Sequence, residues 1–535
     1  RVTFGAGLED EPTFSPDGRF LAYTTDEQGS LDVVVQPLAG GETIRVAATD
    51  ADEAQPAWSP DGSRIAFVSA RDHGGRLGIA LGVSALEPYL NSKLGDIFLA
   101  PALGGAPSKL VEDAYYPSWS PDGKRIVFMA LRDGEFDLWT VPADGGTPSR
   151  LTHDADFDYQ PSWSPDGQWI AYGSGPLSGP HNLRVISAAG GAPKTLTKDY
   201  VYVTRPAWSA DSRTIFFAGE RDGISNAWRM AFSPDGSSSA AERVTIGQGQ
   251  DANLSISRDG KRLAFATVRN EFNIWELTLE TGKLRQITSG SGNADYPQPS
   301  PDGKLLLVSS MRSGSQASWT VDWNGKFLSQ LTPGQVVEEA AKWSPDGREI
   351  VYFDDHARMK IQSVGSMNSR DTGVAGTFAD WSPDGKQIAV SGDRTSGIRF
   401  VIYSLADGKT RPIGQQTLQG PTWSPDGKRI ACFSDVGAIR ELWLVPVDGG
   451  EPRRMTSGEE DSHPAWSAHD PDKILFLRDH KRLALLSVST GQVTFLPGYS
   501  EGSFILDYPA WSVDGKRVYF SVSRKSGDIY VLEGS

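Results

Sequence analysis

A serine motif and seven histidines are the first residues in this sequence to test for chemistry. Gly498-Tyr499-Ser500-Glu501-Gly502 matches the Gly-x-Ser-x-Gly pattern of a hydrolase nucleophile elbow, which also needs an acid and then a histidine further along the chain. No histidine follows His480, so we interpret this pentapeptide as a loop between repeats. The histidines form no His-x-x-x-His pair. We therefore expect no catalytic residues.

Clustered carboxylates and the single cysteine bear on metals and cofactors. Acidic runs occur at 8–11, 50–53, 154–158 and 459–461, and oxygen-rich loops can bind Ca²⁺. None of them matches an Asp-x-Asp-x-Asp-Gly loop with a distal Glu, so solvated carboxylates are the expected role and Ca²⁺ remains an alternative. Cys432 has no second cysteine to pair with. The sequence predicts no cofactor.

Charge and hydropathy exclude some partners. The net charge is −15, and an acidic surface repels phosphate backbones, so nucleic-acid binding is not expected. No stretch of about 18 apolar residues occurs, and no membrane span is expected in this chain.

A chain of 535 residues is too long for one ordinary core, which favours several domains or a repeat array.

A repeated pentapeptide organises the whole chain. Trp-Ser-Pro-Asp-Gly or a degraded copy of it occurs in twelve units, spaced by 38 to 61 residues. The twelve copies begin at Phe14, Trp58, Trp119, Trp163, Trp208, Ile256, Pro299, Trp343, Trp381, Trp423, Trp466 and Trp511. About 45 residues per unit is the length expected of a four-stranded propeller blade.

The pentapeptide has the chemistry of a tight turn between two antiparallel strands. Proline presets φ, aspartate can bond to the local backbone, and glycine accepts a positive φ. Alternating strands follow it, as in 64–68 and 429–433, and later Gly-rich turns mark two more strands per unit. The Trp lies just before the turn and is expected to pack between neighbouring blades. The sequence thus predicts an all-β protein, a tandem β-propeller of twelve four-stranded blades.

The two ends of the chain indicate how the blades divide into rings. Residues 1–4 resemble a fourth strand without its first three, and 529–532 resemble a third strand without its fourth. Because known rings typically have four to eight blades, we expect two six-bladed propellers at 1–282 and 283–535. In this arrangement 2–4 complete the blade of Ile256, and 284–288 complete the blade of Trp511. A seven-plus-five split and a single large ring remain alternatives.

Candidate ligand-binding residues follow from the position of the Trp strand. If this strand is innermost, the residue three places before each Trp lies at the mouth of the central channel. In the first ring these residues are Glu11, Gln55, Tyr116, Gln160, Arg205 and Asn253; in the second they are Tyr296, Ala340, Phe378, Gly420, His463 and Tyr508. The first set is polar or amphipathic, and the second is aromatic or small with one histidine. Six inward residues on a rigid scaffold predict a preformed pocket for a sugar, a carboxylate or a peptide end, and a water-filled channel is the alternative.

The repeats resemble those of TolB-type bacterial propellers, through the Trp-Ser-Pro-Asp-Gly turn, the Arg-Asp-Gly turn, the Asp-Gly-Gly turn and the short Leu-Thr strand. Similar repeats form extracytoplasmic sensor regions of receptor-type kinases and regulators, and they precede peptidase domains. The resemblance therefore implies a non-catalytic binding, sensing or protein-interaction scaffold in the periplasm or outside the cell.

Its ligand would be a protein partner or a small polar molecule, either a peptide or a glycan. The alternatives are a carbohydrate-active enzyme similar to a polysaccharide lyase, for which the chain offers Arg205 and Tyr116, and a substrate-gating propeller of a hydrolase. An apolar insertion at about 77–95 is either a binding element or a segment that folds back on its own blade.

Overall fold

The computed structural model describes most of the chain. The described residues are 1–535 apart from 4–6, 48, 74, 76, 78–94, 133–134, 177–179, 199, 222–223, 247–249, 290–292, 314, 334–340, 393–399, 414–417, 435–438, 500–503 and 534–535. Most of the insertion at 77–95, the candidate Ala340 and Ser500 of the elbow-like pentapeptide lie outside them. Within the described ranges every regular element is a β-strand, and no helix has the length and apolar character to cross a membrane.

The Ser-Pro-Asp-Gly turn is closed by its own side chains, as its chemistry predicts. In the second unit Ser59 Oγ donates to Asp61 Oδ1 at 2.5 Å, and the same oxygen accepts the Ser63 N–H at 3.0 Å. The Gly62 N–H donates to the Ser59 carbonyl at 2.9 Å, with φ of 72° at Gly62. The hydrogen bond from Ser59 is the largest cause that lowers the pKa of Asp61 to about 2. Each copy of this turn joins the first two strands of a sheet.

The repeat Trp connects one blade to the next. Trp58 Nε1–H donates to the Thr13 carbonyl at 3.1 Å, and Trp119 Nε1–H donates to the Ala57 carbonyl at 3.1 Å. The guanidinium of Arg64 lies over the Trp119 ring, 4.9 Å from its centroid. The Trp ring is thus held by a backbone carbonyl and a cation from the preceding blade, which confirms the expected packing between blades.

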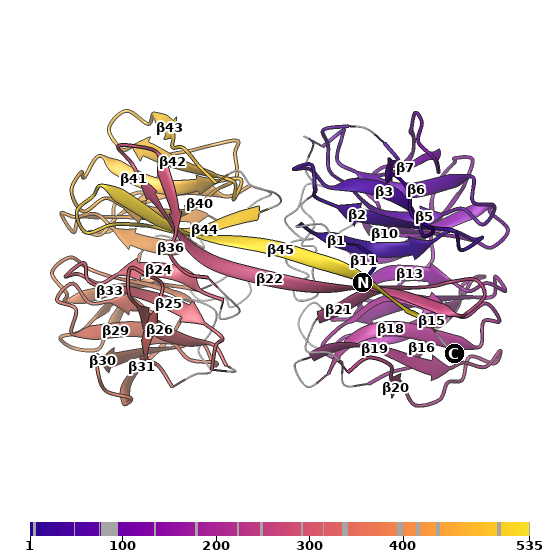
Figure 1. Ribbon diagram of the computed structural model, residues 1–535. Helices are drawn as coiled ribbons and strands as arrows, with labels where there is room; N and C mark the ends of the chain where they lie inside the picture. The colour runs from indigo at the N-terminus through magenta and orange to yellow at the C-terminus, as the bar shows by residue number, and fades with distance from the viewer. Residues whose placement is uncertain are drawn as a thin grey trace. The chain divides into compact units, whose positions relative to one another are not determined.

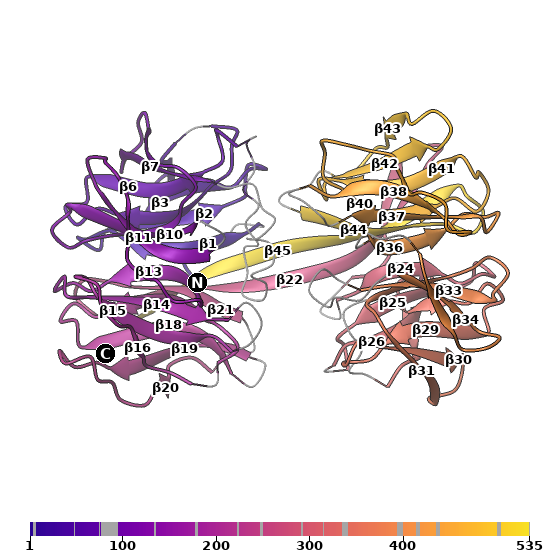
Figure 2. The ribbon, with the colours of Figure 1, turned by 180° about the vertical axis from the view of Figure 1, so that it is seen from behind.

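The chain forms two compact units, Arg1–Asn270 with Lys525–Ser535, and Glu271–Arg524. We call them unit one and unit two. Unit one contains five four-stranded antiparallel sheets in simple strand order (Figures 1 and 2). Their strands are β1 (Glu9–Phe14), β2 (Phe20–Thr25), β3 (Asp32–Pro37) and β4 (Ile44–Arg45); β5 (Glu53–Trp58), β6 (Arg64–Ser69), β7 (Asp96–Pro101) and β8 (Ser108–Val111); β9 (Tyr115–Trp119), β10 (Arg125–Arg132), β11 (Glu135–Pro142) and β12 (Ser149–Arg150); β13 (Phe157–Trp163), β14 (Trp169–Gly175), β15 (Asn182–Ser187) and β16 (Lys194–Thr195); β17 (Val203–Trp208), β18 (Thr214–Arg221), β19 (Ile224–Ala231) and β20 (Glu242–Arg243).

Unit two repeats the same arrangement, with five complete sheets of its own. Their strands are β24 (Asp295–Pro299), β25 (Leu306–Ser310), β26 (Ala317–Val321) and β27 (Phe327–Gln330); β28 (Lys342–Trp343), β29 (Glu349–Phe353), β30 (Arg358–Ser363) and β31 (Ser369–Ala375); β32 (Phe378–Trp381), β33 (Gln387–Ser391), β34 (Val401–Ser404) and β35 (Thr410–Pro412); β36 (Leu418–Trp423), β37 (Arg429–Ser434), β38 (Glu441–Pro446) and β39 (Arg453–Arg454); β40 (Asp461–Trp466), β41 (Lys473–Arg478), β42 (Arg482–Ser487) and β43 (Val493–Phe495).

The sixth blade of each unit is built from strands that the two units share. The remaining strands are β21 (Gln250–Ile256), β22 (Arg262–Thr278), β23 (Lys283–Gln286), β44 (Phe504–Trp511) and β45 (Arg517–Glu533). The two 17-residue strands β22 and β45 lie side by side in Figures 1 and 2 and pair in one sheet, in the order β21-β22-β45-β44. The first half of β22 and the last half of β45 belong to unit one, and the other halves belong to unit two. Ten complete sheets and these two composite blades make the twelve blades that the sequence predicts, six in each unit.

Each composite blade is closed by a short fourth strand. In unit one the Val2 N–H donates to the Ile529 carbonyl at 2.8 Å, and the Ile529 side chain is buried beside Phe14 and Leu21. In unit two β23 pairs with the second half of β22. Val2 and Thr3 of the predicted segment 2–4, whose residue 4 lies outside the described residues, and the segment at 284–288 therefore complete the blades to which the sequence analysis assigned them.

The third strand of each composite blade is one half of the long strand whose other half is the second strand of the other composite blade. The boundary between the two units therefore differs from the predicted one. The sequence places the boundary at 282/283, whereas the units divide at 270/271 and unit one also takes the last eleven residues. The difference arises because β22 and β45 continue without a break where the other blades have a turn between their second and third strands.

Candidate functional site: the channel mouths of the two propellers

In most blades the residue three places before the repeat Trp lies at a bulge in the first strand, although the strand of Phe378 pairs without one. In β5 the pairing with β6 shifts register between Ala54 and Ala57, and Gln55 between them has φ of 62°. The same left-handed backbone occurs at most of the predicted positions: Glu11, Gln55, Tyr116, Gln160, Asn253, Tyr296, Gly420, His463 and Tyr508, while Arg205 and Phe378 occupy this position without a positive φ. The bulge re-aims one side chain per blade, and first strands of successive blades contact one another.

In unit one several of these side chains accept hydrogen bonds from the backbone of a neighbouring blade. Glu11 Oε2 accepts the Gln55 N–H at 2.6 Å, and Gln55 Oε1 accepts the Tyr116 N–H at 2.7 Å. Gln160 Oε1 accepts the Arg205 N–H at 2.6 Å. Five of the six residues are under 9% exposed, and Arg205 is half-buried. The side chains thus form a chain of hydrogen bonds from blade to blade.

Arg205 and Glu11 carry opposite charges in this mouth and influence each other's pKa. Arg205 Nη2–H donates to the Pro56 carbonyl at 3.1 Å, three blades away. Burial, helped by the charge of Asp10, raises the pKa of Glu11 to about 7, although Thr24, Arg205 and Gln55 lower it. Burial lowers the pKa of Arg205, and Glu11 is the largest of the charges that oppose this.

Asn253 completes the set, because its Nδ2–H donates to Asp10 Oδ1 at 2.8 Å. The polar residues predicted to line a pocket in the first ring are therefore partly hydrogen-bonded to one another and to their neighbours, while Gln55 Nε2, Arg205 Nη1 and Asn253 Oδ1 are buried without a hydrogen-bond partner among the described residues. That they bind a ligand stays a prediction.

Unit two has a pocket at the corresponding place. Its empty space, counting the opening to solvent, is about 560 Å³. Twelve residues line it: Tyr296, Gln298, Lys342, Thr377, Phe378, Ala379, Gly420, Pro421, His463, Pro464, Tyr508 and Pro509. All five described candidates of the second ring are among them and are partly exposed. The structure thus brings these five together around one space.

A stacked pair of tyrosines forms one wall of the pocket. The rings of Tyr296 and Tyr508 lie 3.5 Å apart between centroids at an interplanar angle of 25°, and Tyr296 Oη–H donates to Tyr508 Oη at 2.6 Å. These residues belong to the first and last blades of unit two, so the pair also marks where its ring closes. His463 packs edge-on against Tyr508 with centroids 4.6 Å apart.

Behind His463 lies a polar cluster that sequence reasoning missed. His480 Nδ1 is 2.8 Å from Asp507 Oδ1, and His463 Nδ1 is 3.9 Å from the same oxygen. Burial lowers the pKa of His463 to about 3, against the opposing charge of Asp507. Burial also lowers the pKa of His480, but the charge and hydrogen bond of Asp507 outweigh it and leave that pKa raised.

Two positional signals could have pointed to this cluster. His480 lies in the turn after β41, one hairpin away from His463, and Asp507 directly precedes the channel residue Tyr508. Neither signal is visible as a motif, because the three residues meet only when two blades are side by side.

The elbow-like pentapeptide gives no site in the described part of the chain. Its Ser500 lies outside the described residues. Tyr499 is buried, with its ring 4.9 Å from Trp275 and 5.0 Å from Phe504 between centroids. This tyrosine is a packing residue of unit two.

Comparisons with known proteins agree with the repeats. A family model described as the TolB beta propeller domain matches residues 175–341 and 340–533. An uncharacterized protein of Agrobacterium fabrum is 28% identical over 109 residues, covering 19% of this chain and 37% of that protein. The Tol-Pal system protein TolB of Francisella tularensis subsp. mediasiatica is 26% identical over 148 residues, covering 22% of this chain and 34% of that protein.

The chain thus spans little more than a third of the length of either curated relative. Among solved structures, that of a TolB-like protein from Agrobacterium tumefaciens aligns with a TM-score of 0.42 at 22% identity. This alignment covers 48% of this chain and 99% of that one.

Proposed function

This chain belongs to the TolB beta propeller family, and from that premise we propose that it is a non-catalytic binding protein whose ligand enters the pocket of unit two. The supporting observation is the contrast between the two mouths. Five of the six positions in unit one are buried, whereas the five described positions in unit two are partly exposed and line one pocket.

The chemistry of the pocket favours a peptide segment of a protein partner. The pocket is lined by the Tyr296–Tyr508 pair and by Phe378, and by three buried prolines, Pro421, Pro464 and Pro509. Aromatic rings with hydroxyl groups are common anchors in protein interfaces, and grooves of aromatic residues hold extended peptides. Lys342 also lines the pocket, with its ammonium 3.9 Å from Asp380 Oδ1. A glycan stacking on the tyrosines is the competing ligand.

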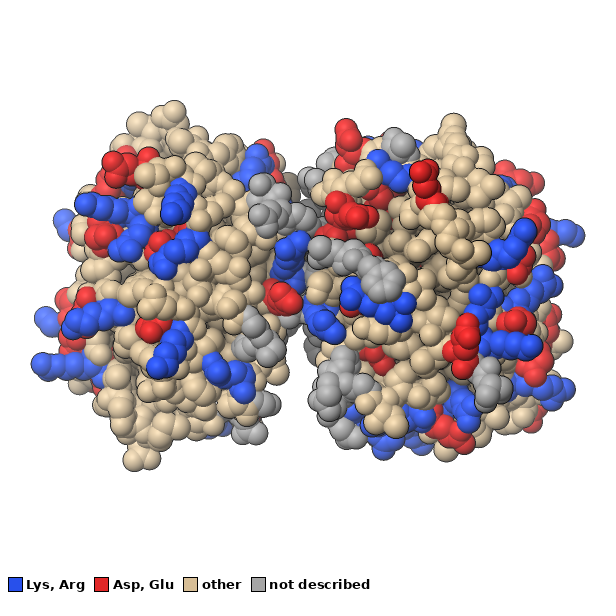
Figure 3. Space-filling view, viewed as in Figure 1, with Lys and Arg blue, Asp and Glu red and all other residues tan. Residues whose placement is uncertain are grey.

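Charged side chains of both signs are mixed on the face shown in Figure 3, where Lys and Arg are not gathered apart from Asp and Glu. On this face no field of one sign would steer a partner, so the proposed specificity comes from the pocket. We further propose a periplasmic or extracellular location, consistent with the resemblance to TolB-type propellers.

The geometry lends less support to the alternative functions. A lyase centred on Arg205 and Tyr116 would need these groups to be open to substrate, yet Tyr116 is 5% exposed and Arg205 is bonded to Pro56. A gating propeller for a hydrolase needs an open channel, and side chains occupy the mouth of unit one. Binding at unit two therefore remains the best-supported function.

A displayed peptide library panned on the full chain, with a glycan array in parallel, tests this proposal. We expect a peptide consensus that binds the wild type and loses at least about tenfold in affinity with Tyr508→Ala or Phe378→Ala, because interface aromatics carry about 2 kcal/mol or more. Tyr116→Ala is the matched control, since it disturbs the mouth of unit one and should leave affinity unchanged. Enrichment on the glycan array alone would contradict a peptide ligand, and binding lost only in Tyr116→Ala would contradict the site.

A further inference from the structure

The cluster behind the pocket has the composition of a metal site. His463, His480 and Asp507 each offer one ligand atom, and these atoms all lie within 4.8 Å of one another. They come from the bulge of β40, the turn after β41 and the bulge of β44. The three side chains are 11 to 23% exposed, so they are screened from bulk water without being sealed off.

Two of these residues have an energetically unfavourable backbone conformation. His463 has φ of 51° and His480 has φ of 49°, both in the left-handed region that side chains other than glycine rarely adopt. His463 shares this conformation with most of the channel positions, whereas His480 has it in a hairpin turn. Residues held in such conformations often serve binding or catalysis.

We propose that His463, His480 and Asp507 bind a divalent transition metal ion of the Zn²⁺ class. Two imidazoles and one carboxylate are a donor set that suits Zn²⁺ and its neighbours rather than Ca²⁺ or Mg²⁺. Three protein ligands leave a coordination position open. Because His463 lines the pocket, this position is accessible to a carboxylate or imidazole of a bound ligand.

A guanidinium beside the cluster competes with the metal ion. Arg440 Nη1 lies 3.2 Å from His480 Nε2, and Arg440 Nε lies 3.6 Å from Glu460 Oε1. When His480 Nδ1 coordinates a metal, its Nε2 carries the proton and cannot accept from Arg440. The guanidinium then keeps its pair with Glu460. Replacing Arg440 by glutamine removes the cation and supplies an amide oxygen that can accept the Nε2–H.

A second histidine–carboxylate group is a built-in control. His73 Nε2 is 2.8 Å from Asp96 Oδ1, and Asp113 is near enough to complete a similar trio. There, however, the ammonium of Lys109 lies 2.9 Å from Asp96 Oδ2 and already neutralises that carboxylate.

Calorimetric titration of the full chain with Zn²⁺, and the visible absorption of added Co²⁺, test the proposal. We expect one high-affinity ion per chain, at least about tenfold weaker binding in His463→Ala and Asp507→Asn, and tighter binding in Arg440→Gln. His73→Ala should bind as the wild type does. Circular dichroism without metal checks the fold of each variant, and His463→Gln serves if His463→Ala does not fold.

Two outcomes would overturn the site: no Zn²⁺ uptake by the wild type, or uptake that His463→Ala and Asp507→Asn leave unchanged. Peptide affinity measured in the presence of a chelator reports on the proposed function separately. If the wild type took up no Zn²⁺ but still bound the peptide, only the proposed metal site would be refuted.

Discussion

The residues at the channel mouths have a strained backbone conformation and differ in type from blade to blade. Eight non-glycine residues there adopt φ between 50° and 62°, and a left-handed residue costs about 1–2 kcal/mol. Their positions could be predicted from the spacing to the Trp. Their conformation could not, because Glu, Gln and Tyr carry no local preference for it and the bulge is imposed by pairing with the second strand.

Burial of Glu11 predicts a pH-dependent stability. Its pKa is raised from 4.5 to about 7 in the folded chain, by burial first and then by the charge of Asp10. The folded state therefore binds the proton more tightly than the unfolded state, so the contribution of Glu11 is most favourable below pH 4.5 and is lost as the pH rises to about 7. The full effect is on the order of 3 kcal/mol.

Urea unfolding of the wild type and Glu11→Gln across this pH range measures the effect. The wild type should lose free energy of unfolding relative to the variant as the pH rises. Glu242→Gln, at an exposed site, serves as the control. A difference between wild type and Glu11→Gln that does not change with pH would refute the buried, protonatable carboxyl.

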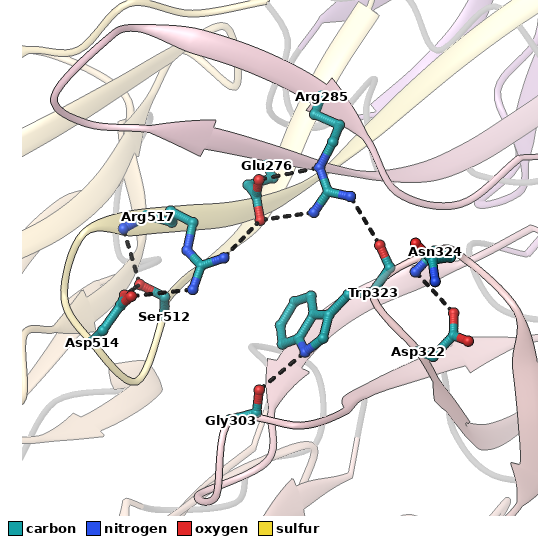
Figure 4. Close-up of polar contacts among 9 residues, drawn as sticks. All are labelled: Glu276, Arg285, Gly303, Asp322, Trp323, Asn324, Ser512, Asp514 and Arg517. Carbon is teal, nitrogen blue, oxygen red and sulfur yellow. Dashed lines mark hydrogen bonds and ion pairs between the residues drawn. The ribbon is translucent and has the colours of Figure 1, made fainter.

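At the scale of elements, the repeat turn and the strand that closes unit two could be predicted from the sequence, but the polar contacts that hold this closure could not. Figure 4 shows Glu276 on β22 accepting from Arg285 on β23, at 3.2 Å from Nε and 3.1 Å from Nη2, with Arg517 of β45 at 3.6 Å. Arg285 also donates to the Trp323 carbonyl at 2.9 Å, which joins the composite blade to the first blade of unit two. These residues are far apart in sequence and follow no motif.

Removing the Glu276 carboxylate should weaken this closure. Glu276 is 6% exposed, and Glu276→Gln replaces the carboxylate that two guanidinium groups share with a neutral amide, which should cost about 1–3 kcal/mol. The control is Glu242→Gln, which weakens the exposed Arg229–Glu242 pair and should cost under about 0.5 kcal/mol. Denaturant unfolding compares the two, and equal losses would argue against a structural role for Glu276.

At the scale of the whole molecule, unit one is completed by the last residues of the chain, and β22 and β45 each contribute one half to either unit. The count of six and six could be predicted from unpaired strands at 1–4 and 529–532. The exchange could not, because 269–271 and 523–528 have the Arg, Asn, Gly and Asp residues of ordinary turns. Antiparallel pairing of two long strands overrides that local signal.

Two substitutions in β45 test the contribution of this strand to each unit separately. Ile529 is buried with Phe14 and Leu21 of unit one, and Phe520 is buried with Leu475 and Leu477 of unit two. Ile529→Ala and Phe520→Ala should each cost about 2–5 kcal/mol. Hydrogen exchange should rise in unit one for Ile529→Ala and in unit two for Phe520→Ala. Loosening of unit two by Ile529→Ala would instead favour closure without exchange.

Hydroxyl-radical footprinting of the full chain, with and without the selected peptide, tests the central claim most directly. The account predicts that Tyr296, Phe378 and Tyr508 are oxidised in the free protein, that peptide protects them, and that buried Tyr116 reacts little in either state. Protection at unit one, with the three aromatic residues of unit two unaffected by peptide, would contradict a ligand site in the pocket of unit two.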